Sequence, residues 1–444
     1  RRWYFVLRHG RVGRCQDFFY MKKSSKNKLF ILGLGYVGLS LAVEFGKKFI
    51  TYGFDKSKKR IKELNNSYDI NGEVSSANIN KSKNLIFTEK IKFIKDCDFI
   101  IICAPTPIDK SNKPDLRLLE KACKDVGKHL SKNSIVCFES TVYPGVTEDV
   151  CVPILSNESK LLWKRDFFVG YSPERINPGD KKRSLTNIDK LVAADTPKTL
   201  NKLSKLYNTI INSKIHKVKT IKTAEAAKVI ENTQRDLNIA FMNELSIIFD
   251  KMKIDFLEVQ KAANTKWNFL NFKPGLVGGH CIGVDPYYLT YVAKKYGYSP
   301  NIILSGRKIN DDMHNYVYKK ILKKIKDRKI EIQKIKTIML GITFKQDCKD
   351  VRNSKAIELA KKFQKKFNSI DIFDPVVSKK EIINHKLNLV NSIKKNYYNV
   401  AILAVPHQAI LDIGILNIVN KLKKNNVFID IMSSVTNEYR DLTL

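Results

Sequence analysis

The sequence predicts an α/β protein in which two α/β domains are joined by a helical region. Short apolar runs of strand length alternate with helical patterns in the first half of the chain, a long helical stretch follows, and the alternation then resumes. Continuous apolar strands separated by helices are typical of a parallel sheet that is covered on both faces. We expect domains over residues 21–215, 216–328 and 329–444 of this 444-residue chain.

The first twenty residues are basic and aromatic, and they lack the apolar core and cleavage site of a secretory signal. The foldable pattern begins just after Met21. We therefore expect residues 1–20 to be a non-native or disordered extension, with Met21 as the natural start.

The N-terminal domain opens with a β-α-β pattern. An apolar strand at 28–32 leads into the sequence Gly-Leu-Gly-Tyr-Val-Gly at 33–38, a helix follows, and a second strand at 49–54 ends at Asp55. This order of strand, glycine motif, helix and acidic strand end is typical of a Rossmann dinucleotide-binding domain. Later elements of this domain are expected at 99–103, 115–130, 135–138 and 167–170.

The glycine motif predicts how a dinucleotide would bind. Gly33 permits the tight turn, Gly35 lets the backbone approach a pyrophosphate, and Gly38 lets the helix pack closely on the sheet. Asp55 can accept hydrogen bonds from both ribose hydroxyls and would repel a 2′-phosphate, which favours NAD over NADP. The alternative is a Rossmann domain that binds another ligand or none.

The helical region and the C-terminal domain follow from the same periodicities. Helices are expected at 224–252 and 303–321, separated by a glycine- and proline-rich stretch at 274–286. Strand-like runs at 334–342, 369–373, 400–405 and 427–431 predict a second, smaller Rossmann-like domain without the glycine motif.

Charge and cysteine content restrict the function class. The chain carries 80 Lys+Arg against 44 Asp+Glu, a formal net charge of +36, which would suit a nucleic-acid-binding protein. Because lysine predominates and is spread along the whole chain, we favour scattered surface lysines and expect no nucleic-acid partner. No run of about 18 apolar residues predicts membrane insertion. The eight cysteines have no disulfide or metal spacing, which indicates reduced thiols, a cytoplasmic protein and no metal site.

One cysteine differs from the others in its surroundings. Cys281 lies in a loop with glycines on both sides and Asp285 nearby, while Lys228 and Asn232 share one helix face upstream. A lysine ammonium close to the thiol would stabilise its thiolate and make it nucleophilic. The alternative, an inert core thiol, fits poorly with the flanking glycines. We reject a Cys–His dyad with His280, because adjacent residues on an extended loop point apart.

The chain resembles the UDP-glucose/GDP-mannose dehydrogenase family over nearly its whole length after Met21. The motifs that carry the resemblance lie at 171–180, 224–236, 266–270 and 275–288, and they are most similar to UDP-N-acetylglucosamine 6-dehydrogenases of the Vi-antigen type. The resemblance implies an NAD-dependent, four-electron oxidation of the C6 alcohol of a UDP-sugar to the uronic acid. It also implies a homodimer through the helical region, a C-terminal UDP-binding domain, and a product for capsular or surface polysaccharide.

The resemblance assigns roles residue by residue. Cys281 would hold the aldehyde as a thiohemiacetal and then a thioester, Lys228 would stabilise the oxyanion, and Glu174 would serve thioester hydrolysis. The remaining catalytic residues would be Asn232, Asp285 and Thr141. Cofactor contacts would come from Gly33, Gly35, Tyr36, Val37, Gly38, Asp55, Arg60, Pro105, Thr106, Ser140, Thr141 and Arg352. Substrate contacts would come from Glu174, Arg175, Lys228, Asn232, Phe272, Gly275, Gly278, Phe344 and Lys345.

Two departures bear on the sugar. Where the UDP-glucose enzymes carry a second Glu and a Lys, this chain has Pro178 and Val284. This argues against plain UDP-glucose and favours an N-acetylhexosamine. UDP-N-acetylgalactosamine, UDP-N-acetylmannosamine and UDP-glucose remain alternatives.

Overall fold

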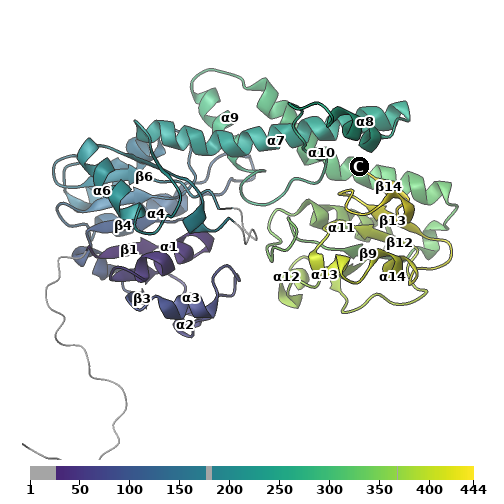
Figure 1. The fold of residues 1–444 in the computed structure, drawn as a ribbon, viewed down its shortest axis with the longest axis horizontal. Helices are drawn as coiled ribbons and strands as arrows, with labels where there is room; N and C mark the ends of the chain where they lie inside the picture. Colours follow the sequence, from purple (N-terminus) through teal and green to yellow (C-terminus); the bar gives the residue numbers. More distant parts are fainter. Residues whose placement is uncertain (1–26, 177–182, 368) are drawn as a thin grey trace, which may run out of the picture.

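The computed structural model describes residues 27–176, 183–367 and 369–444 (Figure 1). Two α/β domains lie side by side, and helices of the central region run along both (Figure 1). The structure confirms the predicted fold class. The predictions for residues 1–20, Met21 and Pro178 lie outside the described residues.

The N-terminal domain is built on an eight-stranded sheet in the order β3-β2-β1-β4-β5-β6-β7-β8. Its strands are β1 Leu29–Leu32, β2 Thr51–Phe54, β3 Leu85–Thr88, β4 Phe99–Ile102, β5 Ile135–Phe138, β6 Phe168–Tyr171, β7 Lys190–Ala194 and β8 Ile215–Lys217. Its α-helices are α1 Tyr36–Gly46, α2 Lys58–Asn65, α3 Ser76–Lys81, α4 Arg117–Gly127, α5 Val152–Ser159 and α6 Pro197–Tyr207.

Alternate residues of β1 enter different cores. Phe30 and Leu32 pack in one buried cluster, and Leu29 and Ile31 pack in another. Since successive side chains of a strand point to opposite faces, both faces of the sheet must be covered by helices. This explains why the strand is apolar at every position rather than at alternate positions.

The expectation of a wholly parallel sheet is wrong at one place. β6 and β7 pair antiparallel, with Tyr171 opposite Ala193, whereas the other pairs of this sheet are parallel. A parallel pair needs a crossover connection, commonly a helix. The described part of the connection between β6 and β7 contains only the short 3-10 helix Leu185–Asn187. The apolar character of β7 could not reveal its direction.

The central region consists of α7 Ile221–Met252, α8 Phe256–Ala263, α9 Asp285–Lys295 and α10 Asn301–Asp327. The 32-residue α7 begins with Thr220, whose side chain accepts a hydrogen bond from the Thr223 amide as an N-cap. The segment between α8 and α9 forms a loop that carries Cys281.

The C-terminal domain has a six-stranded parallel sheet in the order β11-β10-β9-β12-β13-β14. Its strands are β9 Thr337–Leu340, β10 Asp371–Phe373, β11 Asn388–Leu389, β12 Val400–Leu403, β13 Val427–Asp430 and β14 Leu442–Thr443. Its α-helices are α11 Lys355–Phe367, α12 Lys379–Ile383, α13 Gln408–Leu411 and α14 Ile415–Val419. The strand-like runs predicted from 334 onward thus correspond to β9, β10, β12 and β13.

Candidate functional site

The glycine turn after β1 has the geometry that a dinucleotide requires. Gly33 has φ +94°, in the region where side chains are strained, and a Cβ on Gly38 would lie 1.8 Å from the Gly33 carbonyl oxygen. A Cβ on Gly35, by contrast, would meet no atom within 4 Å. Gly33 and Gly38 are therefore needed for the turn itself, while Gly35 leaves open space at the N-terminus of α1, where a pyrophosphate could sit.

Asp55 lies beside this turn at the end of β2. Its carboxylate accepts hydrogen bonds from the Leu34 amide at 3.0 Å and the Ser57 amide at 2.9 Å. These two bonds fix the carboxylate where the predicted ribose contact needs it. Arg60 of α2 is buried nearby, donates to the Leu34 carbonyl at 3.0 Å and pairs with Asp69 at 2.8 Å.

The loops that follow β4 and β5 are tied to each other at the same edge of the sheet. The Ser140 hydroxyl donates to the Ala104 carbonyl at 2.7 Å, and the Thr106 hydroxyl donates to the Thr141 carbonyl at 2.6 Å. Tyr288 of α9 donates in turn to the Thr106 carbonyl. Pro105 lies between the two tied residues, so four of the predicted cofactor positions share one rigid rim that also contacts the central helices.

Four predicted catalytic residues meet around the start of α9. The Asn232 amide donates to the Asp285 carboxylate at 2.5 Å, and Lys228 lies close enough to lower the pKa of both Asp285 and Cys281. The backbone N–H of Asp285 donates to the Cys281 carbonyl at 2.8 Å, which places the thiol one turn before the helix. Lys228 is a buried residue, and among the described residues its ammonium makes no hydrogen bond or ion pair, so it can receive a substrate oxygen.

Burial changes the acidity of this cluster. Desolvation raises the pKa of the Asp285 carboxyl to about 6, against the opposing effects of Lys228 and Asn232. Cys281 retains solvent-accessible surface, yet enough protein surrounds the thiol that desolvation, followed by the Asp285 charge, raises its pKa to about 11. The prediction that Lys228 stabilises the Cys281 thiolate is correct in direction, although other effects are larger. Lys228 does lower the pKa of the thiol, but burial and Asp285 outweigh it.

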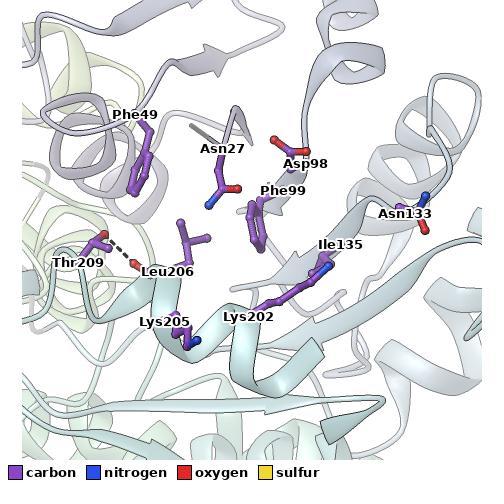
Figure 2. Close-up of a pocket in the computed structure, with 10 residues that line it drawn as sticks. All are labelled: Asn27, Phe49, Asp98, Phe99, Asn133, Ile135, Lys202, Lys205, Leu206 and Thr209. Atoms are coloured by element: carbon purple, nitrogen blue, oxygen red, sulfur yellow. Dashed lines mark hydrogen bonds between the residues drawn. The ribbon is translucent and has the colours of Figure 1, made fainter. Parts of the chain in front are cut away.

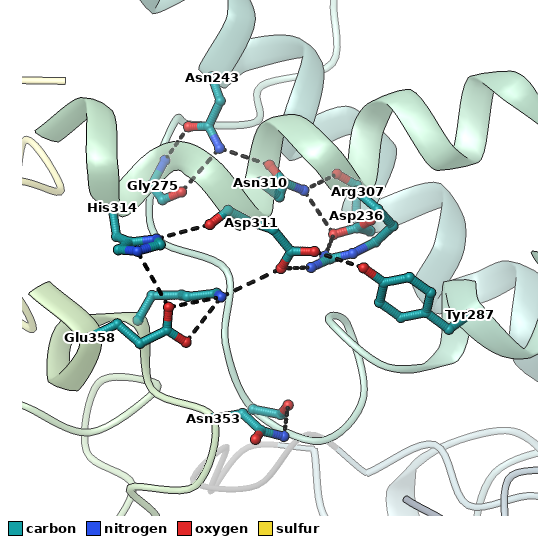
Figure 3. A network of polar contacts seen from close by, with 12 residues as sticks. Asp236, Asn243, Gly275, Tyr287, Arg307, Asn310, Asp311, His314, Asn353 and Glu358 are labelled. Carbon is teal, nitrogen blue, oxygen red and sulfur yellow. Dashed lines mark hydrogen bonds and ion pairs between the residues drawn. The ribbon is translucent and has the colours of Figure 1, made fainter. Parts of the chain in front are cut away.

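The loop that carries Cys281 is held near both ends by one polar network (Figure 3). At one end, Asn243 of α7 accepts from the Gly275 amide at 2.8 Å and donates to the Gly275 carbonyl at 3.1 Å. At the other end, Tyr287 of α9 donates to Asp311 of α10 at 2.7 Å. The buried ion pair between Arg307 and Asp236, at 2.6 Å, connects the two ends through Asn310 and Asp311.

Replacing Asn243 with alanine should lower the free energy of unfolding by about 1–3 kcal/mol, because it leaves buried groups of Gly275 and Asn310 without partners. The midpoint of urea unfolding measures this change. The matched control is Asn315→Ala on α10, which removes only an exposed contact with Asp312. Equal midpoints for the two variants would contradict the assigned role of Asn243.

The C-terminal domain packs against the same loop. A Cβ on Gly279 would lie 2.6 Å from the Phe344 ring, and a Cβ on Gly278 would lie 2.6 Å from the Asn353 carbonyl oxygen. Both glycines are therefore required by close packing between the domains. Lys345 follows Phe344, and its carbonyl accepts from the Thr343 hydroxyl at 2.7 Å. At the other end of the loop, the Phe272 carbonyl accepts from Gln260 of α8 at 2.5 Å.

The His280 ring faces the C-terminal domain and not the thiol. Its Nε2 atom lies 3.4 Å from the Asp350 carboxylate, which also takes a bidentate contact from Arg352. Asp350 and Arg352 in turn act electrostatically on Tyr36, the first residue of α1, whose pKa is raised above its ordinary value mainly by burial. Arg352 therefore lies close enough to the start of α1 to act on Tyr36, which Val37 follows in the same helix.

Glu174 lies on the loop after β6. One carboxylate oxygen accepts from the Arg175 and Ile176 amides at 2.7 and 2.8 Å, and the other lies 3.2 Å from the Lys190 ammonium. Arg175 pairs with Glu231 of α7 at 2.9 Å. Sequence analysis missed Lys190, Asn243 and Asp350, because nothing in the local patterns indicates which distant side chains they meet.

A separate hollow of about 390 Å³ opens near Asn27, Asp98 and Asn133 (Figure 2). These three residues precede β1, β4 and β5, so the hollow lies at the amino ends of the strands. Ligands of open α/β sheets bind beyond the carboxyl ends of the strands. The hollow is therefore on the wrong edge for the cofactor.

Two further properties concern the part of the chain that the structure describes. Within residues 27–176, 183–367 and 369–444, no helix is both long and apolar enough to span a bilayer. Over the same ranges, no group of three or more His, Cys, Asp or Glu residues is placed to hold a metal ion.

Comparison with known proteins matches all three parts of the chain. Models of the UDP-glucose/GDP-mannose dehydrogenase family match its NAD-binding domain at residues 27–211, its central domain at 222–312 and its UDP-binding domain at 338–437. UDP-N-acetyl-D-glucosamine 6-dehydrogenase of Salmonella typhi is 48% identical over 94% of this chain and 98% of its own length. The enzyme of the same name from Pseudomonas aeruginosa is 46% identical over 94% of this chain and 99% of its own length.

The fold of a solved relative agrees. The structure of UDP-D-ManNAc dehydrogenase from Pyrococcus horikoshii superposes with a TM-score of 0.83 at 25% identity, over 94% of this chain and 98% of that one. The cofactor is NAD, as the sequence predicted, and the C-terminal domain is the UDP-binding one. The chain belongs to the UDP-glucose/GDP-mannose dehydrogenase family, whose members are NAD-dependent nucleotide-sugar dehydrogenases.

Proposed function

We propose that this protein oxidises the C6 alcohol of UDP-N-acetyl-D-glucosamine to the carboxylate, with two NAD consumed per sugar. The observation that carries the proposal is the meeting of Cys281, Lys228, Asn232 and Asp285 at the start of α9. The choice of sugar is supported by the relatives from Salmonella typhi and Pseudomonas aeruginosa and by Val284 in place of the lysine of UDP-glucose enzymes.

The first oxidation needs a base for the alcohol proton and a cation for the developing oxyanion. Bound NAD supplies the hydride acceptor for both oxidations. We assign the cation to Lys228, because the residue is buried and its ammonium has no other partner among the described residues. Asp285 receives the proton through the water or alcohol oxygen that Asn232 and Thr141 help to position.

The second oxidation needs a tetrahedral carbon, because the aldehyde itself offers no good hydride to remove. The Cys281 sulfur adds to the aldehyde carbon, and the thiol proton passes to the oxygen that Lys228 holds, which gives a thiohemiacetal. Loss of hydride from the carbon and of the hydroxyl proton then leaves a thioester on Cys281. Since the pKa of the free thiol is about 11, we expect its proton to leave as the carbon–sulfur bond forms.

Hydrolysis completes the reaction. Water adds to the thioester carbonyl carbon, the carbon–sulfur bond breaks, and Glu174 takes a water proton while the sulfur leaves. Glu174 suits this task because two backbone hydrogen bonds and Lys190 hold its carboxylate in place.

Binding residues surround this chemistry in three groups. The cofactor would be held by Gly33, Gly35, Tyr36, Val37, Gly38, Asp55, Arg60, Pro105, Thr106, Ser140, Thr141 and Arg352. The UDP-sugar would be held by Glu174, Arg175, Lys228, Asn232, Phe272, Gly275, Gly278, Phe344 and Lys345. The open space at Gly35 and the fixed Asp55 carboxylate suit the cofactor assignment.

A stoichiometric assay tests the proposed function. Limiting UDP-N-acetyl-D-glucosamine should yield two NADH and one uronic acid per sugar, and it should have the highest kcat/KM in a panel with the galactosamine, mannosamine and glucose analogues. One NADH per sugar would refute the four-electron scheme. Preference for another sugar would refute only the substrate assignment.

The raised pKa of Asp285 predicts the pH dependence of the first oxidation. Because desolvation raises this pKa to about 6, the carboxyl is protonated and unable to accept a proton below that pH. The rate of the first NADH burst should therefore fall about tenfold per pH unit below about pH 6 and be level above it. Asp285→Asn should remove this limb and leave a slow rate. A parent burst that is constant down to about pH 5 would contradict the role of Asp285.

We further propose a homodimer formed through α7. Ile230, Phe241, Ile248 and Met252 are 53%, 52%, 43% and 57% exposed, and their spacing places them on one face of α7. A row of exposed large apolar side chains favours burial against a second copy. Light scattering after size exclusion should give twice the 51.0 kDa chain mass, and Phe241→Glu should shift it towards the monomer. A monomeric parent would refute the dimer.

Cellular placement is part of the same proposal. The seven cysteines of the described residues are all free, which suits a protein that works in the reducing cytoplasm. We expect the uronic acid to be used for a capsular or surface polysaccharide.

A further inference from the structure

A buried lysine joins two buried carboxylates beside the reaction site. The Lys190 ammonium lies 2.7 Å from the Glu139 carboxylate and 3.2 Å from the Glu174 carboxylate. Lys190 and Glu139 are each 3% exposed and Glu174 is 8% exposed. Lys190 also donates to the Pro173 carbonyl at 3.2 Å, and Tyr207 of α6 donates to Glu139 at 2.5 Å. We call Lys190, Glu139 and Glu174 the buried triad.

The reversed direction of β7 brings the triad together. Glu139 directly follows β5, and Glu174 follows β6 by three residues, so both lie at the carboxyl edge of the sheet. Lys190 begins β7, which runs antiparallel to β6 with Tyr171 opposite Ala193. Continuing this register by three residues places Lys190 opposite Glu174. In a parallel β7, the first residue would lie at the other edge, so the strand reversal delivers a cation to the edge where chemistry occurs.

The triad borders the catalytic cluster. Tyr171, the last residue of β6, is buried, and both Asp285 and Glu139 act on it electrostatically. Cys103, at the end of β4, feels Glu139, Lys190 and Glu174, and its carbonyl and Cβ lie against the glycine turn. Members of the triad therefore act electrostatically on residues that also contact the cofactor turn or feel the charge of Asp285.

The charges of the triad do not cancel. Two ionised carboxylates against one ammonium would leave one net negative charge in a buried site, which is costly. Glu174 accepts two backbone hydrogen bonds in addition to the contact with Lys190. Glu139 faces Lys190 of β7, Glu174, Tyr207 of α6 and Cys137 of β5, and desolvation raises its pKa to about 7. Glu139 is thus the member that carries a proton near neutral pH.

We propose that Lys190 and Glu139 are positioning residues that orient Glu174 and set its basicity for the hydrolysis of the thioester on Cys281. The proposal rests on the proposed function, in which Glu174 takes the proton of the attacking water. When Glu139 is protonated, the Lys190 ammonium pairs with the Glu174 carboxylate alone, and this undivided positive charge makes Glu174 a weaker base. With Glu139 ionised, the lysine is shared and Glu174 becomes more basic, so hydrolysis accelerates as the pH rises through about 7.

A single-turnover experiment separates hydrolysis from oxidation. The parent, Glu139→Gln, Lys190→Met and Lys190→Arg are mixed with excess NAD and limiting UDP-N-acetyl-D-glucosamine. NADH is followed by absorbance, and the covalent adduct on Cys281 is followed by intact-protein mass after acid quenching. Lys202→Met is the matched control, since Lys202 is an exposed lysine of α6.

We expect the Lys190→Met variant to form both NADH at near the parent rate, accumulate the thioester and release acid about 100-fold more slowly. The loss arises because Glu174 is no longer oriented by the ion pair at 3.2 Å, and we expect this effect to exceed any gain in the basicity of Glu174. Lys190→Arg should restore part of the loss, and Lys202→Met should match the parent. The isosteric Glu139→Gln should remove the rise in the hydrolysis rate near pH 7. This variant tests the proposal even if Lys190→Met fails to fold.

Two results would overturn the proposal. Either Glu139→Gln hydrolyses the thioester with the parent rate and pH profile, or the variants slow the first oxidation as much as hydrolysis, which would make the triad structural. A parent that yields no NADH from any nucleotide sugar would instead overturn the proposed function, and this inference with it. An active parent therefore distinguishes the two failures.

Discussion

Replacing Cys281 with serine should lower the rate of uronic acid formation by about a thousandfold or more. Serine keeps the size of the side chain but is a far weaker nucleophile towards an aldehyde near neutral pH. The thiohemiacetal would not form at a useful rate. Without it, the aldehyde carbon would not become tetrahedral, and the second hydride could not be transferred. The first oxidation does not need the thiol, so a burst of up to one NADH per active site is expected.

Intact-protein mass and product analysis measure this result. The parent should carry a sugar adduct during turnover, whereas Cys281→Ser should carry none. Cys97→Ser is the matched control, because Cys97 is buried at the amino edge of the sheet and its thiol bonds the Phe93 carbonyl. Acid formation by Cys281→Ser at the parent rate would remove Cys281 from the mechanism.

Replacing Lys228 with methionine should lower kcat by about 10²–10³-fold with a smaller change in KM. Methionine has nearly the same length and fills the same space, so the substitution chiefly removes the charge. The ammonium has no hydrogen-bond or ion-pair partner in the described part of the chain, and removing it leaves no other residue without its partner. The oxyanion of each oxidation step would then develop without a nearby cation.

The acidity of Asp285 offers a second readout for the same variant. Lys228 lowers the pKa of this carboxyl, so Lys228→Met should move the acidic limb of the first oxidation above about pH 6. The matched control is Lys222→Met, which replaces an exposed lysine in the first turn of α7 that pairs with Asp149. An unchanged kcat and an unchanged limb would refute the role of Lys228.

The local sequence pattern was sufficient to predict the start of the N-terminal domain. The β-α-β unit, the turn at Gly33, the close contact at Gly38 and the carboxylate of Asp55 are determined within one short stretch of chain. Glycine acts there through its own backbone, and the strand periodicity fixes both ends of the unit. The sequence therefore determined the fold class, the cofactor edge and the composition of the Cys281 cluster.

Tertiary structure decided the properties that depend on distant neighbours. Only the fold shows that β7 runs antiparallel and brings Lys190 between Glu139 and Glu174. Only the fold shows that burial and Asp285 oppose Lys228 at the Cys281 thiol, because the pKa of the thiol depends on the protein that surrounds it. Strand direction, desolvation and long-range ion pairs arise from packing between segments that are distant in the chain. Local sequence patterns predict each segment, but they do not show which other segments it will contact.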